Sequence, residues 1–582
     1  MEYIWEVAEQ APQSFLETFE EEERALAQIL WNRGLKAPEA VHNCLSPDWD
    51  TLIHDPFLFS QIKAAIARVF AAFETGERIT VHGDYDADGV TGSTVLITVL
   101  REILDQLGGD TGLIDYYIPH RDKEGYGLQM GTIPKLVERG TGLIITVDCG
   151  IACVAEIKSA KEQGIDTIVV DHHEFGEELP EGHLIHPGLP NEPYPWSSLA
   201  AVGVAFKFAT ALLHEARQRG LNFVEGYEKW LLDLVAIATV TDMVPLQGEN
   251  RVLETYGLRV LNKTRRPGLR ALIDRAKLTP GNITVRDIGF GIGPRLNAAG
   301  RMDHAERALH LLLSESMEEA KSLADDLEQL NRQRQTASKK MMLEADQVMD
   351  SHGATAEQSA LVLWQSDWSP ALVGLVAGRF AERYWRPTLV IGMYGNQWIG
   401  SGRSVPGFNV TTAVREAGEG ILTRSGGHEQ ACGFALQDGG QIPEFRDRFY
   451  AYVDAQLDDE ASKPRLNIDM ECPLTDVTET YIRNLARLEP YGQGNPEPIL
   501  LSRKCHVASA DQIGSTKRHL RLLLIDEHGH RVKAIGFSKG ERLKDISVGD
   551  TIDLVYTMAL NEWNGRVNAE CRIVDFKVRP IR

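Results

Sequence analysis

The chain has 582 residues, a length that suits about three to five domains, each able to bury a core. Apolar residues make up 43% and charged residues 25%, as in an ordinary globular protein, and the formal net charge is −22. The length excludes a small fold that depends on disulfides, and the negative charge by itself argues against a polyanionic partner.

The charge is distributed unevenly along the chain. Residues 465–582 contain 18 Lys and Arg against 16 Asp and Glu, a net of +2, so the first 464 residues carry a net of −24. A nucleic-acid-binding surface is a local basic patch. The charge of the whole chain therefore does not exclude such a surface.

Cysteine usage and the N-terminal sequence bear on location. Seven cysteines are scattered without a Cys-x-x-Cys pair, which favours neither a disulfide framework nor a zinc ribbon and indicates a reducing, cytoplasmic compartment. The first residues lack the basic and apolar parts of a signal peptide, and no apolar window reaches the length of a membrane span. We therefore expect a protein that is neither exported nor inserted in a membrane.

Taken in chain order, the sequence predicts short helices and then an alternation of strands and helices. Residues 78–81 form a β-prone run that leads into the polar loop HGDYDADG. Two further apolar runs, GLIITV and DTIVV, end in Asp148 and in Asp171-His172-His173. This alternation indicates a parallel sheet covered on both faces, and ligands bind at the carboxyl ends of such strands.

The later segments differ in character. Residues 231–246 read as an apolar helix interrupted at Asp242, and a capping box at Ser316 opens a charged helix of 34 residues, long enough to connect two lobes. Strand-like alternation follows near the C-terminus, with an Asn564-Gly565 hairpin turn. We predict an α/β protein made of an N-terminal helical segment (1–50), a parallel-sheet domain (51–300), connecting helices (301–355), a second α/β domain (356–462) and a C-terminal β-barrel (463–582).

The loop after residue 81 crowds His82, Asp84, Asp86 and Asp88 into seven residues. Such carboxylates repel one another unless a cation neutralises them. An EF-hand is excluded because position 12 of that loop would be Val95 instead of glutamate, and a polar surface turn is the remaining alternative. Together with the polar strand ends, the loop predicts a site for two ions, Mn²⁺ or Mg²⁺, suited to hydrolysis of a phosphodiester or phosphoanhydride.

Several motifs together resemble a known family. HGDYDADG, TVDCG, VVDHHE and ATVTDMVPL resemble the four motifs of the DHH phosphoesterases. With IPHRDKEGYGL, GFGIGPRLNAAGRM and LEPYGQGNPEP, the chain resembles the bacterial RecJ exonucleases from about residue 50 to its C-terminus. The resemblance implies a DHH catalytic domain, a DHHA1 domain in residues 356–462 and an oligonucleotide-binding (OB) fold for the barrel.

The resemblance also implies roles for the polar strand ends. One ion would be held by His82, Asp86 and Asp148. The other would be held by Asp88, Asp148, His172 and Asp242. Asp84 would be a further ligand or a carboxylate that contacts a ligand without touching the ion. Asp148 would bridge the ions. His173 would contact the scissile phosphate or protonate the leaving group, and Asp171 would orient a histidine.

An exonuclease must also hold the strand through sequence-independent contacts. The positions that resemble the family's substrate-binding residues are Arg121, Arg301, Ser401, Arg403, Gly426, Gly427 and His428, the last three in a Gly-rich loop that reads SGGH where many relatives have GGGH. In the barrel, Phe537, Tyr556 and Trp563 could stack bases. Trp563 beside the hairpin turn is the expected stacking residue, whereas for Phe537 and Tyr556 we expect the alternative, a place in the barrel core.

The expected function is that of a two-metal exonuclease that degrades single-stranded DNA from the 5′ end to mononucleotides, in recombinational repair and mismatch repair. The alternatives are a phosphoesterase of the same superfamily acting on oligoribonucleotides or cyclic dinucleotides, and a non-catalytic single-strand-binding scaffold. The resemblance further implies a monomer that works with the single-stranded-DNA-binding protein and a RecQ-type helicase.

Overall fold

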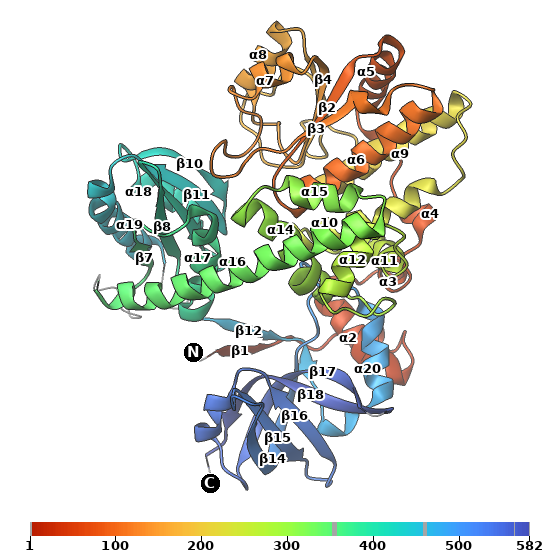
Figure 1. The fold of residues 1–582 in the computed structure, drawn as a ribbon. Helices are drawn as coiled ribbons and strands as arrows, with labels where there is room; N and C mark the ends of the chain where they lie inside the picture. Colours follow the sequence, from red (N-terminus) through yellow and green to blue (C-terminus); the bar gives the residue numbers. More distant parts are fainter. Residues whose placement is uncertain (1–2, 352–357, 458–462, 564, 581–582) are drawn as a thin grey trace. The chain divides into compact units, whose positions relative to one another are not determined.

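A computed structural model describes residues 3–351, 358–457, 463–563 and 565–580. The chain forms two compact units, one of Trp49–Lys463 and one that combines Glu2–Asp48 with Pro464–Arg582 (Figure 1). The two ends of the chain therefore fold together. The five-part division of the chain stays a prediction.

The first unit contains a five-stranded sheet of order β3-β2-β4-β5-β6 in which every pair is parallel. This confirms the predicted parallel sheet. Its strands are β2 (Arg78–Gly83), β3 (Ile114–Tyr117), β4 (Thr141–Val147), β5 (Asp166–Val170) and β6 (His183–Ile185).

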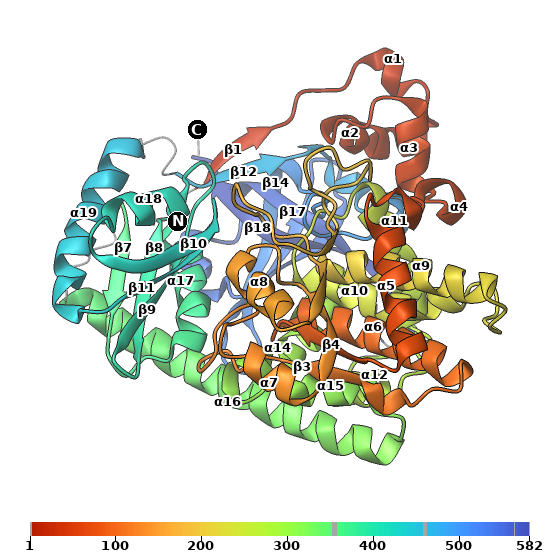
Figure 2. The same cartoon turned by 90° about the horizontal axis from the view of Figure 1, so that it is seen from above.

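Helices cover both faces of this sheet. Ile144 of β4 packs in the core formed with α7 and α8, whereas its neighbours Leu143 and Ile145 pack in the core formed with α5, α6 and α9, because successive strand residues point to opposite faces. Figure 2 shows the sheet between these two groups of helices. The helices are α5 (Ile62–Thr75), α6 (Ala87–Gln106), α7 (Ile133–Glu138), α8 (Val154–Glu162) and α9 (Ala201–Gln218).

A helical region follows the sheet. The apolar helix predicted over residues 231–246 ends earlier, at Thr241, because Asp242 caps it and Met243 turns the chain with a φ of 60°. The predicted long helix is confirmed as α16, with 35 residues and a hydrogen bond from the Glu319 N–H to Ser316 Oγ. The elements are α10 (Leu232–Thr241), α11 (Gly248–Leu261), α12 (Pro267–Arg275), α14 (Gly293–Met302), α15 (Glu306–Leu313) and α16 (Met317–Ser351).

The far end of α16 packs against a second sheet, of order β10-β11-β9-β8-β7, in which only β7 and β8 are parallel. The Gly-rich segment was expected to be a loop, but it lies in edge strand β10, where Gly426 pairs with Gly433 and Gly427 with Cys432. The elements are β7 (Leu361–Trp364), α17 (Pro370–Tyr384), β8 (Thr388–Tyr394), β9 (Gln397–Arg403), α18 (Val410–Ala417), β10 (Leu422–His428), β11 (Ala431–Leu436) and α19 (Ile442–Gln456).

The second unit contains a β-barrel of strand order β13-β14-β15-β16-β18-β17, closed by the pairing of β14 with β17. In the last hairpin Trp563 pairs with Arg566, so a tight turn lies between them as predicted. Asn564 itself lies outside the described residues. The strands are β12 (Arg465–Ile468), β13 (Met470–Glu471), β14 (Leu500–Ile513), β15 (His519–Ile525), β16 (Arg531–Gly536), β17 (Thr551–Trp563) and β18 (Arg566–Val578).

The N-terminal segment belongs to this second unit. Only helices were predicted here, but β1 (Ile4–Val7) is a strand that pairs in parallel with β12. Helix α2 (Arg24–Asn32) buries Leu26, Ile29 and Leu30 in the core of the barrel. The segment therefore completes the C-terminal domain.

Among the described residues, no single helix is long and apolar enough to cross a membrane. The bent pair formed by Trp49–Leu58 and Ile62–Thr75 reaches the required length and composition only when its two parts are taken together.

Candidate metal centre

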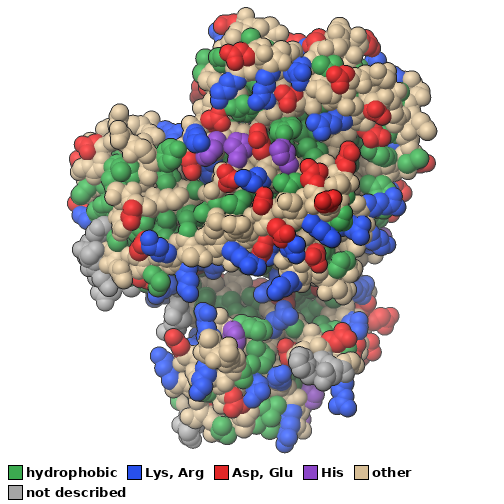
Figure 3. Space-filling view, in the orientation of Figure 1, with side chains coloured by type: hydrophobic (Ala, Val, Ile, Leu, Met, Phe, Trp, Pro, Cys, Tyr) green, Lys and Arg blue, Asp and Glu red, His purple; other side chains and the backbone are tan. Residues whose placement is uncertain are grey.

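The polar residues predicted from the sequence meet at the carboxyl edge of the parallel sheet. Backbone hydrogen bonds continue past the strands: the Asp84 N–H donates to Val147 O (3.2 Å) and the Asp148 N–H to Val170 O (3.0 Å). The ends of β2, β4 and β5 are thereby held in register, and their side chains are brought together. Figure 3 shows histidine side chains gathered with acidic and basic ones on this unit.

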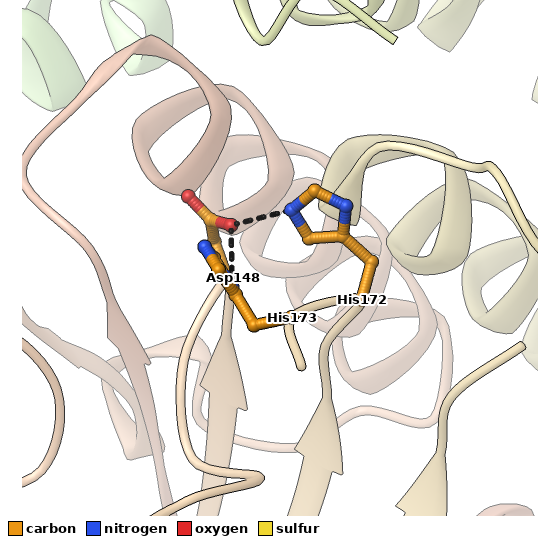
Figure 4. A group of neighbouring side chains, drawn as sticks. All are labelled: Asp148, His172 and His173. Carbon is orange, nitrogen blue, oxygen red and sulfur yellow. Dashed lines mark ion pairs between the residues drawn. The ribbon is translucent and has the colours of Figure 1, made fainter. Parts of the chain in front are cut away.

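Three groups of possible ligand atoms form there, and within each group the atoms lie within 4.8 Å of one another. The groups are Asp148, His172 and His173; Asp88, His172 and Asp242; and Asp84, Asp86 and Asp148. Asp148 and His172 each belong to two groups, and Figure 4 shows both histidines directed at the Asp148 carboxylate. Six of the seven predicted ligands therefore converge on one place.

His172 lies at the centre of these groups. Its Nε2 atom is 3.3 Å from Asp148 Oδ1, 3.6 Å from Asp242 Oδ2 and 3.9 Å from Asp88 Oδ2. Burial, and then the nearby His173, lower the pKa of His172 to about 3. The ring is therefore neutral at physiological pH, as a metal-binding imidazole must be.

Several buried polar atoms in this cluster have no hydrogen-bond partner among the described residues. They are His82 Nε2, Asp84 Oδ1, Asp148 Oδ1 and His172 Nε2. An unpartnered buried polar group is costly, and burial together with neighbouring carboxylates raises the pKa values of Asp84, Asp148 and Asp242. A divalent cation would satisfy these atoms and neutralise the carboxylates, so the residues fit Mn²⁺ or Mg²⁺.

Some predicted ligands have other partners as well. Both oxygens of Asp88 accept N–H groups at the start of α9, from Ala201 and Val202 (2.8 Å each), and Asp86 Oδ1 caps α6. Burial, and then Asp86, raise the pKa of Asp88 to about 7. His82 belongs to none of the three groups, and burial lowers its pKa to about 4. Its role as a ligand stays a prediction.

Both carboxylate oxygens of Asp171 accept hydrogen bonds. Its Oδ1 accepts from His173 Nδ1 (2.8 Å) and from the His172 N–H (2.8 Å), and its Oδ2 accepts from the Ile151 N–H (3.0 Å). Although burial alone would raise it, the hydrogen bond from His173 brings the pKa of Asp171 down to about 2. In His173, burial alone would lower the pKa, but Asp171 raises it. This geometry suits an orienting carboxylate.

Tyr126 is a further residue at the site, and it was not singled out from the sequence. Its hydroxyl donates to the backbone oxygen of Asp148 (2.9 Å) and lies 3.1 Å from His173 Nδ1. The tyrosine stands within the motif IPHRDKEGYGL, but only the folded loop brings it to the end of β4.

Three predicted phosphate-binding arginines lie near one another. Arg121 stacks on Tyr85 (4.7 Å), and Arg301, half-buried, donates to Ala371 O (2.8 Å). Burial, and then the charge of Arg121, lower the pKa of Arg301 to about 9. Burial likewise lowers the pKa of Arg403, which donates to the predicted Ser401 Oγ (2.9 Å).

The predicted Gly-rich positions are exposed on β10. Gly427 has a φ of 144°, and a Cβ there would lie 2.3 Å from Ala431 O, so glycine is required. A Cβ on Gly426 would meet nothing within 4 Å. His428 Nδ1 lies 3.5 Å from Glu174 Oε1, next to His173 in the chain.

The aromatic residues of the barrel differ from expectation in one case. Tyr556 is fully buried, as predicted, but Phe537 is 59% exposed and lies against His519. The prediction that Phe537 is a core residue is wrong. The side chain of Trp563 lies outside the described residues.

Comparison with known proteins identifies the family. The DHH family N-terminal domain matches residues 78–239, the DHHA1 domain residues 357–455 and the RecJ OB domain residues 468–575. The chain is 38% identical to the single-stranded-DNA-specific exonuclease RecJ of Bacillus subtilis (strain 168) over 556 residues, which are 95% of this chain and 68% of the relative. The chain belongs to the RecJ family. RecJ of Escherichia coli (strain K12) is 32% identical over 571 residues, 96% of each protein.

Solved structures of the family agree with the fold. RecJ of Thermus thermophilus in complex with Mn²⁺ is 31% identical, with a TM-score of 0.83 over 99% of this chain and 80% of that one. Its complex with Mg²⁺ gives a TM-score of 0.77 over 99% and 79%, at 30% identity. The predicted fold, a DHH domain, a DHHA1 domain and an OB barrel, is confirmed.

Proposed function

We infer that this chain is a metal-dependent exonuclease specific for single-stranded DNA, and we propose that it degrades strands from the 5′ end to mononucleotides. The observation that carries the inference is the pair His172 Nε2 and Asp148 Oδ1, buried, 3.3 Å apart and without hydrogen-bond partners among the described residues. It occurs in a chain whose relatives are named single-stranded-DNA-specific exonucleases.

We propose that the cofactor is Mn²⁺ or Mg²⁺, two ions in all. The proposed ligands are His82, Asp84, Asp86, Asp88, Asp148, His172 and Asp242. When bound, the ions would polarise the phosphodiester and make water a stronger nucleophile. In support, the donor set consists of carboxylate oxygens and neutral imidazole, which suits both cations, and related solved structures contain each of them.

The side chains around this centre would bind the strand and move a proton. Because Asp171 holds Nδ1 of His173, Nε2 of that ring is the nitrogen left to contact the scissile phosphate or to pass a proton to the leaving oxygen. Arg121, Arg301 and Arg403 would offset phosphate charge without reading the sequence. The glycines and His428 on β10 would extend this contact.

The barrel favours a polymeric substrate over a small one. Residues 468–575 match the RecJ OB domain, and exposed Phe537 and the basic side chains Lys517, Arg518 and Lys533 would hold a strand. A phosphoesterase for oligoribonucleotides or cyclic dinucleotides does not need this domain.

The cellular setting is proposed on family resemblance. We propose a monomer that acts in recombinational and mismatch repair with the single-stranded-DNA-binding protein and a RecQ-type helicase. We also propose a cytoplasmic location, which is supported by seven scattered cysteines without a Cys-x-x-Cys pair.

Strands labelled at either end test the proposal. With Mn²⁺, the purified chain should release labelled mononucleotide at once from a 5′-labelled strand, and should shorten a 3′-labelled strand progressively. A blunt duplex of the same sequence should remain intact. Immediate release of the 3′ label, or equal cutting of the duplex, would reject the assignment.

A further inference from the structure

The hydroxyl of Tyr126 connects two residues of the proposed centre. It donates its single hydrogen to the backbone oxygen of Asp148 at 2.9 Å, and its oxygen lies 3.1 Å from His173 Nδ1. The rings of Tyr126 and His173 meet edge to face, with centroids 5.5 Å apart. One phenol thus contacts both Asp148, which two of the ligand groups share, and the proposed proton donor.

The backbone of Asp148 needs such support. Its φ is 62°, in the left-handed region that residues with a Cβ seldom adopt unless their surroundings impose it. The Asp148 N–H donates to Val170 O (3.0 Å), and its carbonyl accepts from Tyr126. Hydrogen bonds on both sides of this residue therefore hold the conformation that directs its carboxylate toward His172.

The loop around Tyr126 has a defined conformation. Gly125 and Gly127, on either side, have φ values of 87° and 79°, and Gln129 Nε2 donates to Tyr126 O (2.6 Å). The same loop carries Arg121, which stacks on Tyr85 next to the acidic cluster. Arg121 is thus held by a contact of its own with Tyr85, which does not involve the phenol of Tyr126.

We propose that Tyr126 is a positioning residue, whose hydroxyl fixes the backbone of Asp148 through its hydrogen bond to the carbonyl, so that this metal ligand keeps its geometry, while its ring packs against His173. The proposal rests on the proposed metal-dependent hydrolysis and adds a residue to it. Tyr126 is 42% exposed, so the competing role is that of a surface on which a base stacks.

Tyr126→Phe separates these roles, because it removes only the hydroxyl and keeps the ring. Tyr116→Phe is the matched control, since the hydroxyl of Tyr116 also contacts a histidine, His310 Nε2 at 2.5 Å, at a different position in the fold. The measurements are the Kd for Mn²⁺ by titration calorimetry without DNA, and kcat and KM for a single strand. Thermal unfolding checks that each variant is folded.

We expect Tyr126→Phe to weaken Mn²⁺ binding and to lower kcat, each by about 10- to 100-fold, the usual effect of losing a group that orients a metal ligand, with KM unchanged. Tyr116→Phe should match the wild type. If Tyr126→Phe has the Kd and kcat of the wild type, the proposal is overturned. This holds whatever the KM of Tyr126→Ala, a variant that removes the ring and so tests only the base-stacking role. If the wild type binds Mn²⁺ but cleaves no strand, the proposed function fails, while the comparison of Mn²⁺ affinities still decides the role of Tyr126.

Discussion

His172 Nε2 and Asp148 Oδ1 lie 3.3 Å apart, and neither atom has a hydrogen-bond partner among the described residues. The same nitrogen also faces carboxylates from α6 and from the end of α10. A single proton cannot serve three carboxylates, whereas cations placed among them can. The arrangement is therefore that of ligands around metal ions, and this relationship underlies the predictions on activity.

Replacing Asp148 should abolish cleavage and spare strand binding. Asp148→Asn keeps the shape of the side chain and removes its charge, and Asp148→Ala removes the ligand altogether. Since losing a group that only supports a ligand costs about 10- to 100-fold, losing this ligand should lower kcat by more than about 100-fold. Steady-state cleavage and fluorescence anisotropy with a labelled strand measure the two effects.

The control for that substitution is Asp438→Asn, which changes an exposed aspartate that caps a turn through the Gly440 N–H (2.8 Å). It should cleave like the wild type. If Asp148→Asn cleaved single strands at the rate of the wild type, the role given to Asp148 would be contradicted.

Glu254 gives a prediction about pH. Its carboxyl group is fully buried in α11 with both oxygens unpartnered among the described residues, and burial raises its pKa well above the ordinary value. The stability contributed by its protonated form is complete below the unfolded-state pKa and is lost as pH rises through the folded-state pKa. Glu254→Gln mimics the protonated form, so its free energy of unfolding should increase relative to the wild type between about pH 6 and about pH 9.

Urea unfolding at both pH values measures this difference. Glu138→Gln, at an exposed glutamate, is the control and should show no such trend. A difference between Glu254→Gln and the wild type that stays constant with pH would show that Glu254 is ionised in the folded protein.

The buried ion pair of Lys207 and Glu249 should be essential to stability. Its charged atoms are 2.5 Å apart, and the two side chains are 1% and 0% exposed. Lys207→Met leaves a buried carboxylate without its cation, which costs about 3–5 kcal/mol. Lys161→Met removes the exposed pair with Glu181 and should leave the midpoint of thermal unfolding unchanged. Equal midpoints for the two variants would refute this account.

The N-terminal segment should stabilise the barrel. Leu30 of α2 is fully buried in the same core as Leu500, so Leu30→Ala should destabilise the second unit by about 2–5 kcal/mol. Val548→Ala, at a 67% exposed position of the same unit, is the control and should change little. Hydrogen exchange of the barrel strands measures both, and unchanged protection in Leu30→Ala would exclude a structural role for the segment.

Local pattern was sufficient to predict the parallel sheet and the place of its polar strand ends. Apolar runs that end in Asp148 and Asp171 define strands and their carboxyl edge, and a parallel sheet brings those edges together. The long helix was also predicted correctly, because periodicity and the Ser316 capping box are local signals.

Long-range contacts account for what the sequence did not reveal. β1 has only four residues, and Ile4 pairs with Arg465, which is far away in the sequence, so no local pattern predicts this strand. The glycines of SGGH suggested a loop, but pairing with β11 makes them a strand. Exposure of Phe537 and the position of the Tyr126 hydroxyl depend on how loops fold back, which periodicity does not encode.

The most direct test of the metal centre is an anomalous difference map from crystals of the full chain soaked in Mn²⁺, recorded at the manganese edge. We predict peaks within coordination distance of both His172 Nε2 and Asp148 Oδ1. Absence of manganese density between these two atoms, in crystals of a protein that degrades single strands, would contradict the account.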